Sequence, residues 1–131
     1  MNLTSLRIIT DDIKRSVQFF EKITDLAATW YTEDFAEIVA GTSTLAIGST
    51  RTIRLFGEGI AEPASNKSVI IEFRVENVDD EYARLKDSII NIVQQPTTMS
   101  WGNRSLLFRD PDGNLINFFT PVTPEAIKKF G

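Results

Sequence analysis

Hydrophobic and polar residues follow the same order of periodicities twice along this chain. The first half begins with a short β-rich run over residues 6–10, and Asp11 or Asp12 can cap a helix after it. Ile13, Val17 and Phe20 then recur at helical spacing. Three further strands are expected over residues 27–31, 35–40 and 44–47. The first half therefore reads as β-α-β-β-β.

The second half repeats this order after a polar, glycine-containing stretch. Residues 52–56 extend the first sheet or lead into the linker, and residues 57–67 have linker composition. After it, Asn77 is a candidate helix cap, followed by a helical face at Val78, Tyr82 and Leu85. The strands of this half are expected over residues 69–75, 90–93, 105–108 and 115–119.

The two halves match at a constant offset of 65 residues. Five pairs share this offset: Ile8 and Phe73, Asp12 and Asn77, Ile13 and Val78, Val17 and Tyr82, Phe20 and Leu85. Two unrelated βα pieces with generic amphipathicity are the alternative, but an internal duplication explains a shared offset through a strand, a cap and a helix. We expect one domain, 1–131, made of a module over about 1–56, a linker over 57–67, a module over 68–122 and a short helical tail over 123–131.

A tight turn joins the last two expected strands. The turn sequence is DPDGN, residues 110–114, in which Pro111 presets φ and Gly113 or Asn114 can take a positive φ. Hydrophobic runs flank it, so the segment predicts a hairpin. Asn117, a polar residue in the middle of the following strand, is placed directly before two phenylalanines.

Composition removes several classes of chemistry. The 131 residues contain no histidine and no cysteine, which excludes Ser-His-Asp and Cys-His catalysis and the commonest ligands of zinc, iron and copper. A net charge of −4 with no basic patch argues against a nucleic-acid partner. No apolar stretch has the length of a membrane span and no secretory signal is present, so a cytoplasmic protein without a membrane partner is expected.

Three segments together resemble the vicinal oxygen chelate superfamily, which includes glyoxalase I, extradiol dioxygenases and bleomycin-resistance proteins. They are LRIITDDIKRSVQFF (6–20), FRVENVDDEYARLK (73–86) and the DPDGN turn, and they cover both halves of the chain. The resemblance implies an α+β fold in which two tandem βαβββ modules form a cupped mixed sheet, usually completed by a second subunit as a homodimer.

The resemblance also indicates where metal ligands would stand. Family members that bind a metal use side chains at the positions of Ser5 and Ile70 and carboxylates at the positions of Asn117 and, to within one or two residues, Ala46. None of these four is a good ligand, because serine and asparagine are weak neutral donors and the other two have nothing to donate. We therefore expect no metal and no other cofactor. In this respect the sequence is closest in style to the metal-free, bleomycin-resistance-like members of the superfamily.

Strand alternation predicts which side chains could line the cup instead. Arg7 and Glu72 lie two residues beyond Ser5 and Ile70, and we hypothesise that they pair across the empty site; the alternative is that both face solvent. Further candidates for ligand binding are Arg74, Asn117, Phe119, Trp30 and Trp101. The two tryptophans offer flat apolar surfaces for a ring-bearing ligand, or else they belong to the core or a dimer interface.

Four functions are compatible with these features. The first is a metal-free homodimer that holds a small, partly aromatic or cationic ligand, as in bleomycin-resistance proteins. The second is a metal-independent enzyme with Glu72 as general base and Arg7 polarising an oxygen. The third is a metal-dependent lyase or dioxygenase, which the missing ligands disfavour. The fourth is a ligand-sensing or partner-binding module without chemistry.

Overall fold

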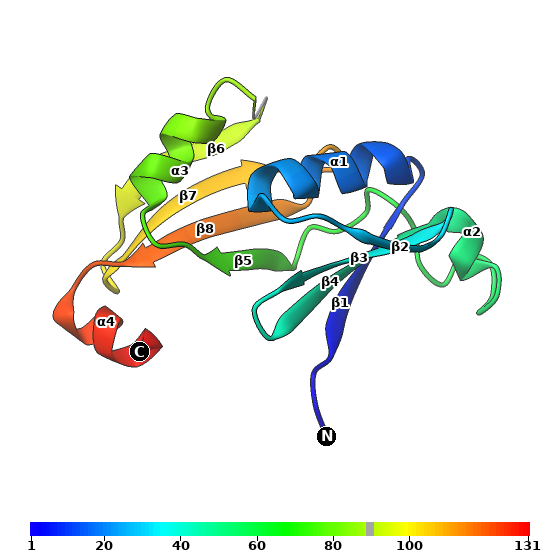
Figure 1. Cartoon of the computed structure of the whole chain (residues 1–131), viewed down its shortest axis with the longest axis horizontal. Coiled ribbons are helices and arrows are strands. Elements are labelled where there is room, and N and C mark those ends of the chain that lie inside the picture. The colour runs from blue at the N-terminus through cyan, green and yellow to red at the C-terminus, as the bar shows by residue number, and fades with distance from the viewer. Residues whose placement is uncertain (89–90) are drawn as a thin grey trace. The chain divides into compact units, whose positions relative to one another are not determined.

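The computed structural model describes residues 1–88 and 91–131 and contains two four-stranded mixed sheets, each with its own helix (Figure 1). The chain divides into two compact units: unit 1 is residues 1–66 with 111–113, and unit 2 is residues 67–110 with 114–131. The fold is α+β and is built from two tandem βαβββ modules, as the repeated pattern predicts.

Sheet A, in unit 1, has the strand order β1-β4-β3-β2. Its strands are β1 (Ser5–Thr10), β2 (Thr29–Thr32), β3 (Phe35–Ala40) and β4 (Ser43–Ser49). β1 runs parallel to β4, and the other neighbours are antiparallel.

Sheet B, in unit 2, has the equivalent order β5-β8-β7-β6. Its strands are β5 (Ile70–Arg74), β6 (Ile92–Thr98), β7 (Asn103–Arg109) and β8 (Leu115–Pro121). β5 runs parallel to β8, and the remaining pairs are antiparallel. The shared strand order and the shared parallel pair confirm the duplication. The predicted strand over 90–93 begins at residue 90, which lies outside the described residues.

One amphipathic helix covers a single face of each sheet (Figure 1). In unit 1 it is α1 (Ile13–Thr24), which contacts β3 and β4 and begins where the Asp12 carboxylate accepts a hydrogen bond from the Arg15 amide. Val17 and Phe20, predicted on its apolar face, are 1% and 0% exposed. Burying these side chains is the main contribution that holds the helix on the sheet.

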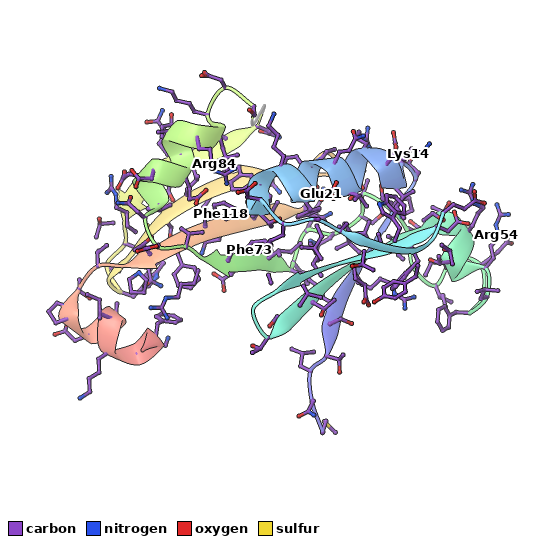
Figure 2. All side chains as sticks on the ribbon, in the orientation of Figure 1. Lys14, Glu21, Arg54, Phe73, Arg84 and Phe118 are labelled. Atoms are coloured by element: carbon purple, nitrogen blue, oxygen red, sulfur yellow. The ribbon has the colours of Figure 1, made fainter. Side chains whose placement is uncertain are left out.

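In unit 2 the covering helix is α3 (Val78–Leu85), which contacts β6, β7 and β8. The Asn77 side chain accepts hydrogen bonds from the amides of Asp79 and Asp80, so the predicted cap is confirmed. Figure 2 shows Phe73 and Phe118 together on sheet B, where their rings meet edge to face at 5.5 Å.

We call the face of each sheet that α1 or α3 does not cover its far face. Side chains alternate along a strand, so the residues beside each buried core position point to this far face. In sheet A these include Arg7, Phe35 and Glu37, and in sheet B they include Glu72, Asn117 and Phe119. Five of the seven candidate ligand-binding residues lie on these two faces: Arg7, Glu72, Arg74, Asn117 and Phe119.

Two short helices differ from the main pattern. Residues 52–56 do not continue the sheet: α2 (Thr50–Ile53) forms because the Ser49 hydroxyl accepts a hydrogen bond from the Arg51 amide as an N-cap. The strand alternative for this segment was wrong. The tail forms α4 (Pro124–Phe130), with Thr123 as N-cap and proline at the first position, as predicted.

The hairpin between β7 and β8 is confirmed. Arg109 pairs with Leu115, and the Asp110 carboxylate accepts hydrogen bonds from both the backbone and the side-chain amide of Asn114, each at 2.8 Å. Gly113 takes the positive φ of 85°. In addition, Asp112 of this turn pairs with Arg15 of α1 at 2.9 Å. None of the helices in the described residues is long and apolar enough to cross a membrane.

Candidate functional site

The strand ladders place the candidate residues of the two modules at equivalent positions. Arg7 lies opposite Ala46 in the parallel β1–β4 pair, and Glu72 lies opposite Asn117 in the parallel β5–β8 pair. Ala46 is therefore the structural counterpart of Asn117, as the resemblance implied to within one or two residues. Equivalent positions on the two far faces therefore carry side chains of different chemical types.

On the far face of sheet B, Glu72 and Asn117 are hydrogen-bonded to each other. The Asn117 side-chain amide donates to the Glu72 carboxylate at 2.8 Å. Because a carboxylate only accepts, this bond identifies the amide nitrogen of Asn117 as the atom that faces Glu72. The other atom of the amide, Oδ1, is buried and has no partner in the described residues. A buried oxygen without a partner is uncommon, because leaving it unsatisfied costs about 1–3 kcal/mol.

A second unpartnered oxygen lies on the same rung. Leu107 of β7 is opposite Asn117, and Gln94 of β6 is opposite Leu107, so the four side chains share the far face. The Gln94 Oε1 atom is buried and has no hydrogen-bond partner among the described residues. We call Glu72, Asn117 and Gln94 the acceptor row, with Leu107 as the apolar residue between its two amides.

Gln94 reaches this face because of a β-bulge. Ile92 pairs with Phe108 on the α3 side of the sheet, and the register shifts before Gln94 pairs with Leu107. The extra residue turns Gln94 to the opposite face from the one that regular alternation gives it. Sequence reasoning missed Gln94 for this reason, since nothing in the residues 92–94 marks a bulge.

Helix α4 covers the far face of sheet B at the next rung. The Phe130 ring lies 5.1 Å from that of Phe119, which is 7% exposed, and Arg74 donates a hydrogen bond to the Phe130 carbonyl. A depression of about 390 Å³ lies beside this contact, lined by Arg74, Val75, Glu76, Thr120, Pro121 and Ile127. Two predicted ligand-binding residues thus contact the protein's own C-terminal helix.

The two tryptophans lie apart from these groups. Trp101 is 64% exposed in the β6–β7 loop. Trp30 pairs with Ala36, a fully buried residue of β3 whose neighbours Phe35 and Glu37 point to the far face. Trp30 is therefore on the α1 side of sheet A, on the opposite face from Arg7.

On the far face of sheet A, Arg7 lies over two aromatic rings. Its guanidinium carbon is 5.0 Å from the ring centre of Phe35 and 5.8 Å from that of Phe56. A Cβ at Gly48 would come within 3.7 Å of the Arg7 Cδ, so the arginine stem runs over this glycine. We call Phe35, Arg7 and Phe56 the arginine stack.

A clasp at the start of α2 holds the segment that carries Phe56. The Asp34 carboxylate accepts hydrogen bonds from the Arg51 guanidinium at 2.8 Å and from the Ser49 hydroxyl at 2.7 Å. These two bonds, the arginine first, lower the pKa of Asp34 below its ordinary value. The same pair raises the pKa of Arg51, so both groups are charged at neutral pH.

A second clasp holds α3 to sheet B. Arg104 of β7 donates two hydrogen bonds to the Asp79 carboxylate, at 2.8 and 3.0 Å. This bidentate pairing lowers the pKa of Asp79 and raises that of Arg104. Arg51 and Arg104 are therefore engaged in holding helices.

The positions where relatives bind a metal do not present a donor set. Ser5 and Ile70 are exposed at the starts of β1 and β5, Ala46 carries only a methyl group, and the Asn117 amide is bonded to Glu72. Among residues 1–88 and 91–131, no three acidic side chains gather as metal ligands would. The residues present do not fit a divalent metal ion. The expected pair of Arg7 with Glu72 joins residues of different units and stays a prediction.

Comparison with known proteins gives consistent results at the levels of sequence family and fold. A family model described as the Glyoxalase/Bleomycin resistance protein/Dioxygenase superfamily matches residues 2–118. An uncharacterized protein of Bacillus subtilis (strain 168), YraH, is 28% identical over 125 residues, covering 91% of this chain and 98% of the relative.

Two solved structures illustrate the likeness of fold. A glyoxalase/bleomycin resistance protein/dioxygenase from Nocardioides superposes with a TM-score of 0.78 at 22% identity, covering 95% of this chain and 85% of the other. A family enzyme from Burkholderia phytofirmans PsJN superposes with a TM-score of 0.83 at 16% identity, covering 93% of this chain and 100% of the other. At these identities the likeness concerns the fold alone.

Proposed function

This chain belongs to the Glyoxalase/Bleomycin resistance protein/Dioxygenase superfamily, and from that premise we propose that it is a metal-free binding protein for a small, partly aromatic, amine-bearing molecule. The binding surface is the acceptor row on the far face of sheet B. The observation that carries the proposal is the pair of buried amide oxygens, Asn117 Oδ1 and Gln94 Oε1, on the rung of the Glu72 carboxylate, neither of which has a partner within residues 1–88 and 91–131.

The acceptor row determines what kind of ligand fits. Its two buried amide oxygens and the exposed Glu72 carboxylate all accept hydrogen bonds. An ammonium or amidinium group supplies several donors and a positive charge, so it satisfies these oxygens best. The net charge of −4 favours the approach of a cation.

The spacing of the row supports a ligand with an apolar centre. Asn117 and Gln94 lie on β8 and β6 with Leu107 of β7 between them. Neighbouring strands are about 4.8 Å apart, so the two amides are separated by about 10 Å. A molecule with donors at both ends and a ring or chain over Leu107 matches this arrangement.

A titration with a small diamine tests the proposal. p-Xylylenediamine carries an ammonium at each end of a benzene ring, and 1,4-benzenedimethanol has the same shape without the charges. Charge-assisted hydrogen bonds are roughly twice as strong as neutral ones, so the diamine should bind about tenfold more tightly than the diol. Equal binding of the two, measured by calorimetry or NMR, contradicts the proposal.

The variant Glu72→Gln provides the matched control within the protein. It keeps the shape and the hydrogen bond from Asn117 while removing the charge, so the preference for the diamine should fall while binding of the diol is preserved. Glu76→Gln removes a charge from an exposed residue outside the acceptor row and should leave the preference unchanged.

One accompanying feature is proposed on the same basis. We propose that the protein forms a homodimer, which agrees with exposed apolar side chains on β2 and β3, where Tyr31 is 63% and Val39 is 57% exposed. Light scattering after size exclusion tests it: a mass near 29 kDa, twice the 14.7 kDa chain, supports the dimer and a mass near that of one chain contradicts it.

A further inference from the structure

The arginine stack of unit 1 is a binding element of opposite polarity from the acceptor row. We propose that Arg7 is a receptor for the carboxylate of a small aromatic acid, held edge-on beside Phe35 and Phe56. This site lies within unit 1 alone and does not rest on the proposed function of sheet B.

The geometry of the stack restricts how Arg7 can be approached. A guanidinium is planar, with its N–H donors directed outward in the plane. The Phe35 and Phe56 rings lie within 5.0 and 5.8 Å of its carbon, and the stem is supported by Gly48. The two rings attract the cation and orient it. Their attraction acts on the charge of the guanidinium and does not use its directed N–H hydrogen bonds, so these donors remain available. A bidentate carboxylate uses those donors.

Arg7 differs in this respect from other arginines of the chain. Four of them make ion pairs with carboxylates: Arg15 with Asp112, Arg51 with Asp34, Arg84 with Glu81 and Arg104 with Asp79. Within the described residues of unit 1, Arg7 contacts rings and makes no ion pair. An exposed arginine that is oriented and lacks an anion is suited to take one from a ligand.

The neighbouring residues favour an aromatic acid. The Tyr31 ring lies 6.1 Å from the Phe35 ring and is exposed, as is Phe56. A flat ring attached to the carboxylate can therefore contact aromatic surface beside the guanidinium. A tetrahedral anion such as phosphate has no flat apolar part to contribute, so it should bind less tightly than an aromatic carboxylate.

Benzoate is the probe for this site, and NMR titration of the backbone amides is the measurement. Arg7→Gln should weaken benzoate binding by about tenfold or more, because charge-assisted bidentate bonds are lost. Phe56→Ala should weaken it by about threefold, because one of the two orienting rings is removed. Both side chains are exposed, and thermal unfolding of each variant verifies that the fold is retained.

Two neighbouring residues provide matched controls. Leu55→Ala removes an 88% exposed apolar side chain next to Phe56, and Arg54→Gln removes one positive charge at the end of α2, where Figure 2 shows its side chain. Neither should change benzoate affinity by more than about twofold. An equal loss with Arg54→Gln contradicts the proposal, because binding would then reflect diffuse charge.

Further outcomes test the ligand class and separate this site from the acceptor row. Benzyl alcohol or inorganic phosphate binding as tightly as benzoate overturns the assignment to an aromatic carboxylate. Glu72→Gln should leave benzoate binding unchanged, and Arg7→Gln should leave p-xylylenediamine binding unchanged. If Arg7→Gln leaves benzoate affinity unaltered, the arginine stack is not the receptor, whatever the diamine does.

Discussion

The far faces of the two sheets share a backbone plan and differ in every side chain that matters for binding. The rung Arg7–Ala46–Glu37 of sheet A corresponds to Glu72–Asn117–Leu107 of sheet B. A cation over two rings stands where the other module has a carboxylate bonded to an amide. The helix-covered faces, in contrast, carry the buried apolar core in both modules.

This difference separates what holds the fold from what is available for function. Burial of the helix faces requires apolar residues at fixed spacing, so Phe20 and Leu85 keep the same role at 0% and 1% exposure. The far faces carry no such requirement. Their residues are free to differ between modules, and the same scaffold presents acceptors on one sheet and a cation on the other.

The largest effect should come from the shared core. Phe20→Ala and Leu85→Ala each remove a buried side chain at equivalent positions, and should lower the free energy of unfolding by about 3–5 and 2–5 kcal/mol respectively. Urea unfolding measures both. A small loss at only one of the two positions would show that the modules are not equivalent in packing.

The next largest loss of stability is expected where helix α4 begins. Within its own unit, this helix covers only the far face of sheet B. Gly102 has a φ of 96°, and a Cβ there would lie 2.1 Å from the Thr123 hydroxyl, so Gly102→Ala should displace the start of α4 and lower stability by about 2–3 kcal/mol.

Gly41→Ala is the control for backbone strain. Gly41 also has a positive φ, 62°, but a Cβ there meets nothing within 4 Å, so this change should lower stability by only about 1 kcal/mol. Equal losses at the two glycines would mean that packing of α4 against Gly102 contributes little.

A smaller effect should follow when the acceptor row receives a second charge. Asn117→Asp places a carboxylate within hydrogen-bond distance of Glu72, and should lower stability at pH 7 by about 1–2 kcal/mol. Protonating either carboxyl removes this repulsion, so stability should be regained at acidic pH.

Asn117→Ala makes this rung of sheet B resemble that of sheet A at Ala46. It removes the bond to Glu72 together with the unpartnered oxygen, so its effect should be smaller and independent of pH between 5 and 8. A pH dependence as steep as that of Asn117→Asp would place the titrating group elsewhere.

The smallest effect is expected at the clasp of α2. The pKa of Asp34 is lowered in the folded state, mainly by its hydrogen bond with Arg51. The clasp therefore stabilises the folded protein fully at pH values above the ordinary pKa of 3.8. This contribution is lost as the pH falls through the lower pKa that Asp34 has in the folded state. Because the pair is exposed, Asp34→Asn should lower Tm by about 2 °C or less.

The measurement is Tm of wild type and Asp34→Asn as a function of pH. The difference should be constant from pH 8 to pH 5 and should close only at strongly acidic pH. A difference that closes between pH 8 and pH 5 would contradict the assigned direction of the pKa.

The fold was predictable because its signals are local and repeated. Alternation, the caps Asp12, Asn77 and Thr123, and the DPDGN turn each follow from neighbouring residues, and the 65-residue offset connects them. Residues 52–56 show the limit, since their β-rich composition was overridden when Ser49 capped a helix.

The candidate site was predictable only in part. Alternation placed Arg7, Glu72 and Asn117 on far faces, but their partners come from distant segments: Phe56 from beyond α2, and Phe130 against Phe119 from the tail. Gln94 depends on a bulge, and the bulge beside Trp30 likewise affects which residues of β2 point to each face. These features arise from tertiary packing and leave no local pattern.

The acceptor row is tested most directly by the side-chain amide NMR signals of the protein titrated with p-xylylenediamine. The account predicts that the NH₂ signals of Asn117 and Gln94 shift together, with one saturation curve, and that Glu72→Gln weakens that curve by about tenfold. Saturable binding that leaves both signals unmoved, or no binding at all, would contradict the claim that these amide oxygens receive a ligand.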